Sequence, residues 1–226
     1  MQLLIGNKNY SSWSMRPAVL VRHFNLPVTE VMLRFDSFAP GSVFKTRLAA
    51  LPAAGKVPVL IDGDQVVWDS LAIAETLAER FPDAGLWPRD AAARARARSL
   101  CAEMHSGFGA LRSACPMNIE AGLPEVGARV LAEQPAVVAD LARLHLLWES
   151  ALAAHGGPFL FGAFSIADAY FAPVLMRCRT YALPLSAPVA AWAQAVEASP
   201  GVAAWVRDAL AEHDFLAFEE PYRQAR

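Results

Sequence analysis

The sequence predicts an α/β fold in two parts, a small mixed N-terminal part and a larger all-helical part. Short apolar runs alternate with helical patterns over residues 1–81. Residues 82–90 hold prolines and a glycine, which is typical of a linker, and no convincing strand pattern follows them. We therefore expect one domain at residues 1–81, a linker at 82–90, and an all-helical domain at 91–226.

The N-terminal part predicts the element order β-α-β-α-β-β-α. A helical crossover joins the first two strands, so these should be parallel. The hairpin signal Asp62-Gly63-Asp64 joins the last two, so these should be antiparallel. Strands are expected at residues 2–5, 28–33, 57–61 and 65–68, and helices at 15–24, 43–51 and 70–81.

The C-terminal part shows apolar stripes at helical spacing. One stripe is Leu100, Met104, Phe108 and Leu111. Further helices are expected around residues 137–148, 165–181, 187–198 and 202–213, and the segment 165–181 is apolar almost all round, which predicts a central buried helix. Ser165 and Asp168 have the spacing of a capping box, so their role should be structural.

The composition is that of a globular protein rich in core residues. The chain has 226 residues, 55% of them hydrophobic and 19% charged, with a formal net charge of −2. No basic block favours a nucleic-acid partner, and no apolar run reaches the ~18–20 residues that a membrane span needs. No leader pattern stands at the N-terminus, and three scattered cysteines show no metal-ligand spacing. We expect reduced thiols, no metal and a cytoplasmic location.

Four motifs in order resemble the cytosolic glutathione transferase family over the whole chain. They are residues 11–16 (Ser-Ser-Trp-Ser-Met-Arg), residues 55–60 (Gly-Lys-Val-Pro-Val-Leu), the pair Asp69-Ser70, and residues 165–168 (Ser-Ile-Ala-Asp). The resemblance implies a thioredoxin-like N-terminal domain with a helical C-terminal domain, the GST fold. It also implies glutathione as co-substrate and a homodimer.

The serine run is most similar to the serine-type classes, zeta and tau. Counting back five residues from Arg16 gives Ser11 as the catalytic position, whereas the theta spacing gives Ser12; Trp13 stands where zeta has a cysteine. A free thiol has a pKa of ~8.5, and the thiolate is the nucleophile. The serine would donate a hydrogen bond to the glutathione thiolate and would not itself be a nucleophile.

The other motifs imply a binding site for the rest of glutathione. In this family the Val57-Pro58 bond is cis, so that the Val57 backbone can pair with the peptide-like ligand. Asp69 would meet the ammonium of the γ-glutamyl group, and Ser70, expected as the helix N-cap, would meet its carboxylate. Lys45 and Lys56 are candidates for the glycyl carboxylate.

The second substrate is expected between the domains. Candidates to line its pocket are Trp13, His105, Phe108 and Arg112. The resemblance favours a transferase that adds glutathione to small hydrophobic electrophiles. A glutathione-dependent isomerase, dehalogenase or peroxidase, and a non-catalytic binding or regulatory module of the same fold, stay open as alternatives.

Overall fold

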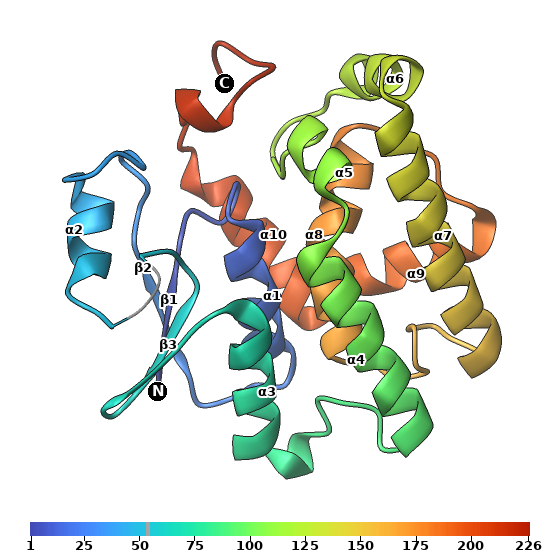
Figure 1. Ribbon diagram of the computed structural model, residues 1–226, viewed down its shortest axis with the longest axis horizontal. Coiled ribbons are helices and arrows are strands. Elements are labelled where there is room, and N and C mark those ends of the chain that lie inside the picture. Colours follow the sequence, from blue (N-terminus) through green and yellow to red (C-terminus); the bar gives the residue numbers. More distant parts are fainter. Residues whose placement is uncertain (53–54) are drawn as a thin grey trace.

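The computed structural model describes residues 1–52 and 55–226 and has the two parts that the sequence predicts (Figure 1). The N-terminal part combines a sheet with three helices. Its elements are β1 (Gln2–Ile5), α1 (Ser12–His23), β2 (Thr29–Met32), α2 (Val43–Ala49), β3 (Val59–Asp62), β4 (Gln65–Val67) and α3 (Ser70–Arg80).

The C-terminal part is helical. After the short 3₁₀ helix η1 (Pro82–Ala84) come α4 (Ala91–Ser106), α5 (Gly109–Ala114), α6 (Pro124–Glu133), α7 (Pro135–His155), α8 (Ile166–Thr180), α9 (Ala187–Ala198), α10 (Pro200–Glu212) and η2 (Ala217–Glu219). No helix among the described residues is both long and apolar enough to cross a bilayer.

The sheet has the strand order β2-β1-β3-β4. β1 and β2 are parallel, and β3 and β4 are antiparallel, which confirms both predictions. β1 also pairs antiparallel with β3. Alternate residues of β1 point to opposite faces: Leu4 packs in the cluster of α2, whereas Leu3 and Ile5 join the main core. Figure 1 shows α2 on one side of the sheet and α1 and α3 on the other.

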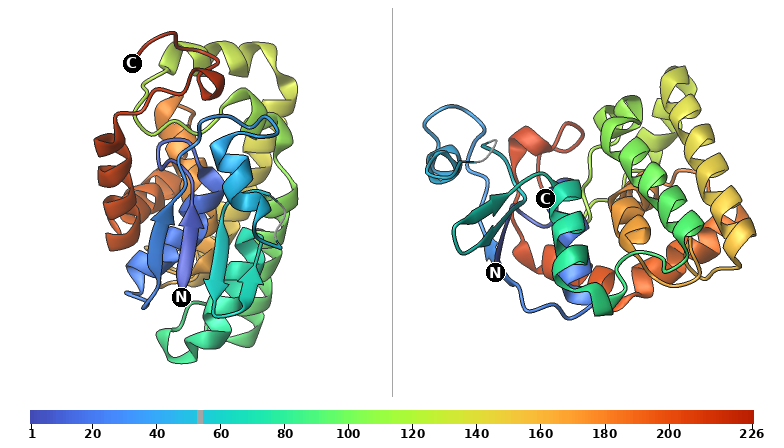
Figure 2. Two further views of the ribbon diagram at one scale, coloured as in Figure 1. Left: turned by 90° about the vertical axis from the view of Figure 1, so that its left-hand side faces the viewer. Right: turned by 60° about the horizontal axis from the view of Figure 1, so that its bottom comes forward.

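Helix α1 lies in the middle of the molecule. Eight consecutive residues, 14–21, are buried, because the sheet covers one side of the helix while α8 and α10 cover the other (Figure 2). Close approach of α10 requires Gly201: a Cβ there would lie 2.3 Å from the carbonyl oxygen of Val19. The helix that follows the serine motif is therefore held by both parts of the protein.

Two helix predictions are wrong in detail. α1 begins at Ser12, three residues before the predicted start at residue 15, so Pro17 lies inside the helix. The apolar stripe from Leu100 to Leu111 is divided between α4 and α5, because the backbone turns at Phe108, which has a φ of 58°. Helix α6 was not predicted.

The capping box at Ser165 and Asp168 is confirmed, and both side chains are buried. Asp168 accepts hydrogen bonds from the Ser165 and Leu160 backbone N–H groups and from the Trp192 indole N–H, at 2.9–3.0 Å. The three cysteines are free and buried. Within residues 1–52 and 55–226, no group of three or more His, Cys, Asp or Glu side chains is placed to hold a metal ion.

Candidate functional site

The serine motif lies at the junction of β1 and α1. Ser11 occupies the N-cap position of α1, but its hydroxyl does not cap the helix. It donates instead to the Ser14 Oγ at 2.7 Å, and that oxygen also accepts the Gly6 backbone N–H at 3.1 Å. Ser14 is fully buried and Ser11 is only 7% exposed. The Ser11 hydroxyl is thus fixed at the positive end of α1, where partial charge favours an anion.

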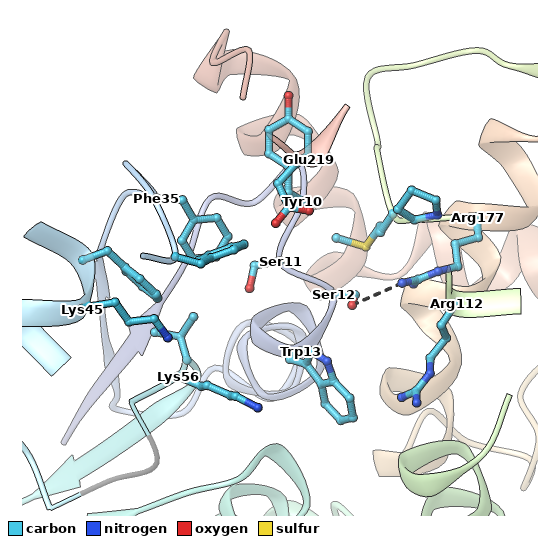
Figure 3. A pocket seen from close by; sticks show the side chains of 15 residues that line it. Tyr10, Ser11, Ser12, Trp13, Phe35, Lys45, Lys56, Arg112, Arg177 and Glu219 are labelled. Atoms are coloured by element: carbon cyan, nitrogen blue, oxygen red, sulfur yellow. Dashed lines mark hydrogen bonds between the residues drawn. The ribbon is translucent and has the colours of Figure 1, made fainter. Parts of the chain in front are cut away.

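Ser11 lines a cavity of about 470 Å³ between the two parts of the protein (Figure 3). Figure 3 shows Lys45 and Lys56 on one side of the serine, and Arg112 and Arg177 on the other. Aromatic side chains and the C-terminal segment complete the wall. The lining residues are Tyr10, Ser11, Ser12, Trp13, Phe35, Phe38, Phe44, Lys45, Lys56, Val57, Arg112, Pro116, Met117, Arg177 and Glu219.

A second cavity of about 380 Å³ shares Trp13, Lys56 and Val57 with the first. Its remaining lining residues are Pro58, Trp68, Asp69, Ser70 and His105. The Val57–Pro58 peptide bond is cis, as the resemblance implies. The structure therefore brings the residues predicted to bind glutathione together along two cavities with a common wall.

Asp69, and not Ser70, is the N-cap of α3, so the cap prediction is wrong. The Asp69 carboxylate accepts the Leu71 N–H at 3.1 Å, and its other oxygen lies 3.1 Å from the His105 Nε2. Ser70 begins the helix and is fully buried. Its hydroxyl lies 3.0 Å from the Tyr170 hydroxyl in the helical part. Asp69 and His105 thus join the two parts of the protein beside the second cavity.

The residues predicted for the second substrate are divided between the cavities. Trp13 and Arg112 line the first, and Trp13 and His105 line the second. Phe108 lines neither, which corrects the prediction, because its ring is buried in the main core where α4 ends. Lys45 faces the first cavity while its Nζ donates to the Gly55 carbonyl at 2.9 Å.

Several residues that line the first cavity were not predicted from the sequence. Tyr10, Phe35 and Phe38 come from loops, and Glu219 comes from η2, where no motif marks them. For Arg177 the sequence does hold a signal: it is a charged residue within the helix predicted to be buried, where an isolated cation is costly. That cost marks a position where function is expected.

The wall around Ser12 is rich in buried positive charge. Burial, followed by the neighbouring arginine charges, lowers the pKa of Arg177 to about 10. Burial likewise lowers the pKa of Arg16 to about 10. The Arg16 guanidinium is stacked between the rings of Trp13 and Tyr170, with its carbon 4.2 and 4.6 Å from their centroids, and the ring faces favour its charge.

Comparison with known proteins decides the family. The profile described as "Glutathione S-transferase, N-terminal domain" matches residues 10–80, and that of the C-terminal domain matches residues 90–208. The chain belongs to the glutathione S-transferase family. A relative from Caenorhabditis elegans, described as "Probable maleylacetoacetate isomerase", is 29% identical over 180 residues, which are 77% of each chain. Glutathione S-transferase 1 of Dianthus caryophyllus is 35% identical over 95 residues, 42% of this chain and 41% of that one.

Solved structures of glutathione S-transferases share the fold. A Burkholderia glutathione transferase homologue with bound glutathione has a TM-score of 0.62 at 24% identity, covering 94% of this chain and 98% of that one. The beta-class enzyme of Sphingomonas chungbukensis has a TM-score of 0.64 at 23% identity, covering 92% and 98%. The tau-class enzyme of mango has a TM-score of 0.67 at 19% identity, covering 93% and 96%. Because similar structures come from several classes, the zeta and tau resemblance is looser than the family assignment.

Proposed function

We propose that this chain is a transferase in which the Ser11 hydroxyl donates a hydrogen bond to the glutathione sulfur and holds it as a thiolate for attack on a small electrophile. The observation that carries this proposal is the place of Ser11, at the N-terminus of α1 and on the wall of the larger cavity. Both the hydroxyl and the helix terminus favour the thiolate over the thiol.

The magnitudes agree with this role. Lowering a thiol pKa by ~2 units requires ~2.7 kcal/mol of preference for the thiolate. A charge-assisted hydrogen bond contributes ~1.5–3 kcal/mol, and a helix N-terminus adds ~0.3–1 kcal/mol. One hydroxyl at one helix end is therefore sufficient, and Ser11 needs to transfer no proton itself.

The rest of glutathione would extend along the two cavities. The Asp69 carboxylate and the first N–H groups of α3 would meet the ammonium and carboxylate of the γ-glutamyl group. The Val57 backbone, next to the cis bond, would pair with the peptide. Lys45 and Lys56 are placed on the side of the cavity that a second carboxylate, that of the glycyl residue, would reach.

Ser12 is the other candidate for the thiolate donor. It is the first residue of α1, and its Oγ lies 3.5 Å from a guanidinium nitrogen of Arg177, as the dashed line in Figure 3 shows. That contact directs an Arg177 N–H toward Ser12, whereas the partner of the Ser11 hydroxyl, within the described part of the chain, is only the Ser14 hydroxyl. The Ser11 hydroxyl can exchange this neutral partner for the charged thiolate, which favours Ser11 as the thiolate donor.

The test is the pKa of the glutathione thiol in the complex, followed by thiolate absorbance in the ultraviolet for wild type, Ser11→Ala and Ser12→Ala. Ser11→Ala should raise this pKa by about 1–2 units, the loss of one charge-assisted hydrogen bond. Ser113→Ala, at an exposed position on α5, is the matched control and should change nothing. A shift with Ser12→Ala and none with Ser11→Ala would assign the role to Ser12.

The isomerase alternative is favoured by one finding, the Caenorhabditis elegans relative described as a probable maleylacetoacetate isomerase. An isomerase would use the same thiolate, add it to a conjugated double bond and release it after rotation. Assay of wild type with cis-configured diketo acids and catalytic glutathione separates the two activities, because an isomerase consumes no glutathione.

We also propose a homodimer in the cytoplasm, as is typical of the family. Apolar side chains exposed on α7 (Val138 and Leu146) and next to β4 (Trp68) support a protein partner on these surfaces. Light scattering at micromolar concentration tests it, and a mass near the 24.4 kDa of one chain would contradict it.

A further inference from the structure

Arg112 and Arg177 form a cationic wall on the side of the larger cavity away from the two lysines (Figure 3). Arg112 extends from α5, and its guanidinium donates to the His105 carbonyl at 3.4 Å. Arg177 extends from α8 and donates to the Pro173 carbonyl at 3.3 Å and to Ser12. Among the described residues, Arg177 thus reaches the cavity with only neutral oxygens as partners, and Arg112 with the His105 carbonyl and the Trp13 ring, whose centroid lies 5.4 Å from the guanidinium carbon.

Arg177 is almost wholly buried, with 6% of its surface exposed. Its Nε is buried and has no hydrogen-bond partner among the residues that the structure describes. Ionised side chains are rarely buried without a counter-charge, because removing them from water is energetically costly. A buried guanidinium at a cavity wall whose hydrogen-bond acceptors, the Pro173 carbonyl and the Ser12 hydroxyl, are neutral therefore has unused capacity for an anion.

No acid of the described chain supplies that counter-charge. None of the ion pairs within residues 1–52 and 55–226 includes Arg16, Arg112 or Arg177. Of the described residues that line the cavity, Glu219 is the one acid; it comes from η2 and lies beyond Tyr10, away from the arginines (Figure 3). Arg16 is stacked between the rings of Trp13 and Tyr170 and adds further positive charge.

We propose that the second substrate is an electrophile that carries a carboxylate, and that Arg177 and Arg112 bind this carboxylate. A planar guanidinium donates two parallel N–H groups to a carboxylate, the geometry in which arginine is most selective. The phenylalanines at 35, 38 and 44 line the same cavity and would take the apolar part of the molecule. The proposal rests on the proposed function for its reactive partner, the thiolate at Ser11.

An activated aryl halide such as 4-chloro-3,5-dinitrobenzoate illustrates the step. The thiolate lone pair forms a C–S bond at the ring carbon that bears chlorine, and the nitro groups accept the displaced electron pair. The C–Cl bond then breaks and chloride leaves with its bonding electrons. The carboxylate on the arginines takes no part in this exchange and only positions the ring.

Glutathione itself is a second source of carboxylates. Its peptide is expected on the side of Val57, where Lys45 and Lys56 already supply positive charge, so the arginines remain for the other substrate. If the arginines bind the second substrate, removing one of them weakens that substrate. If they bind glutathione, the same variant weakens glutathione instead.

The decisive experiment is titration calorimetry with 3,5-dinitrobenzoate and its methyl ester, which have no leaving group, on protein saturated with S-methylglutathione. Wild type should bind the anion at least about 10-fold more tightly than the ester. Arg112→Gln and Arg177→Gln should each weaken the anion about 10-fold or more and change the ester less than two-fold. Arg207→Gln, an exposed arginine on α10, is the matched control and should change neither.

Equal binding of anion and ester by wild type would overturn the inference. So would variants that weaken S-methylglutathione instead of the anion, because the arginines would then serve glutathione. If Arg177→Gln fails to fold, Arg112→Gln and the ratio of anion to ester affinity in wild type still test the proposal. Turnover of 4-chloro-3,5-dinitrobenzoate and of its methyl ester reports separately on the proposed function: absence of both activities in wild type, with selective anion binding intact, would refute the transferase and leave the anion site standing.

Discussion

Ser14 joins the strand, the loop and the candidate catalytic residue, and its replacement by alanine tests this connection. The Ser14 Oγ accepts the buried Gly6 N–H at 3.1 Å and lies 2.7 Å from the Ser11 Oγ. When Ser11 turns its proton toward a thiolate, the Ser14 hydroxyl can donate to the Ser11 oxygen in its place. Ser14→Ala removes both bonds and retains the fold of α1, which has no other need of that oxygen.

Two effects of different size should follow. The buried Gly6 N–H loses its partner, which costs about 1–3 kcal/mol of stability. For a chain of this length that lowers Tm by roughly 2–4 °C per kcal/mol. The loss of the Ser14–Ser11 hydrogen bond weakens the neighbouring Ser11–thiolate hydrogen bond by ~10–30%. The pKa of the glutathione thiol should therefore rise by only roughly 0.1–0.7 units.

Thermal unfolding and the ultraviolet thiol titration measure these effects on one preparation. The expected pattern is a clear loss of Tm with a small shift of the thiol pKa, the reverse of Ser11→Ala. Ser113→Ala again controls for the loss of a hydroxyl. An unchanged Tm would refute the assignment of the Gly6 bond, and a pKa shift as large as that of Ser11→Ala would make Ser14 a direct partner of the sulfur.

Three further predictions concern the frame that holds the site. Gly201→Ala should destabilise the protein by about 1–3 kcal/mol in denaturant unfolding, because its Cβ would meet the Val19 carbonyl oxygen at 2.3 Å, whereas Gly122→Ala, whose Cβ would meet no neighbouring atom of the described residues within 4 Å, should be nearly neutral. Burial raises the pKa of Asp168 to about 6 from its ordinary value of 3.8, so the folded chain binds an extra proton between these values. Its contribution to the unfolding free energy should therefore fall as pH rises from 4 to 6 and stay constant above, and Asp168→Asn, though less stable, should lack that slope; a parallel pH profile in the variant would contradict this. Burial raises the pKa of Cys115 to about 11 and of Cys178 to about 12, and that of Cys101 well above its ordinary range. A thiol reagent at pH 8 should label none of them in the native protein and all three in denaturant, and rapid native labelling would show that a cysteine is open to solvent.

The fold was predictable because its signals are local. Alternating apolar runs, a hairpin turn and the capping box at Ser165 each depend on neighbouring residues, and all three are confirmed. Helix ends were less predictable where two caps compete. Asp69 caps α3 because the Ser70 hydroxyl is taken by Tyr170, 100 residues further along the chain.

The site was predictable only where the resemblance supplied motifs. Nothing near Glu219 or Phe38 in the sequence shows that they face Ser11, since tertiary packing alone brings them there. Phe108 was predicted to line the pocket from a continuous helix. The backbone instead turns after α4, and this turn places the Phe108 ring in the main core. The glutathione-binding roles of Lys45 and Lys56 and the domain boundaries at residues 81 and 90 stay predictions.

The burial of α1 on all sides limits how this protein can be recombined with its relatives. A chimera that joins the first 80 residues to another helical part would keep the serine motif and lose the surfaces of α8 and α10 that hold it. The donor would need a glycine where Gly201 meets Val19 and a matching Tyr170 against Ser70. Exchange of the outer elements α2 or α6 leaves those contacts intact, so variation in such a lineage should accumulate at the periphery while α1, α8 and α10 change together.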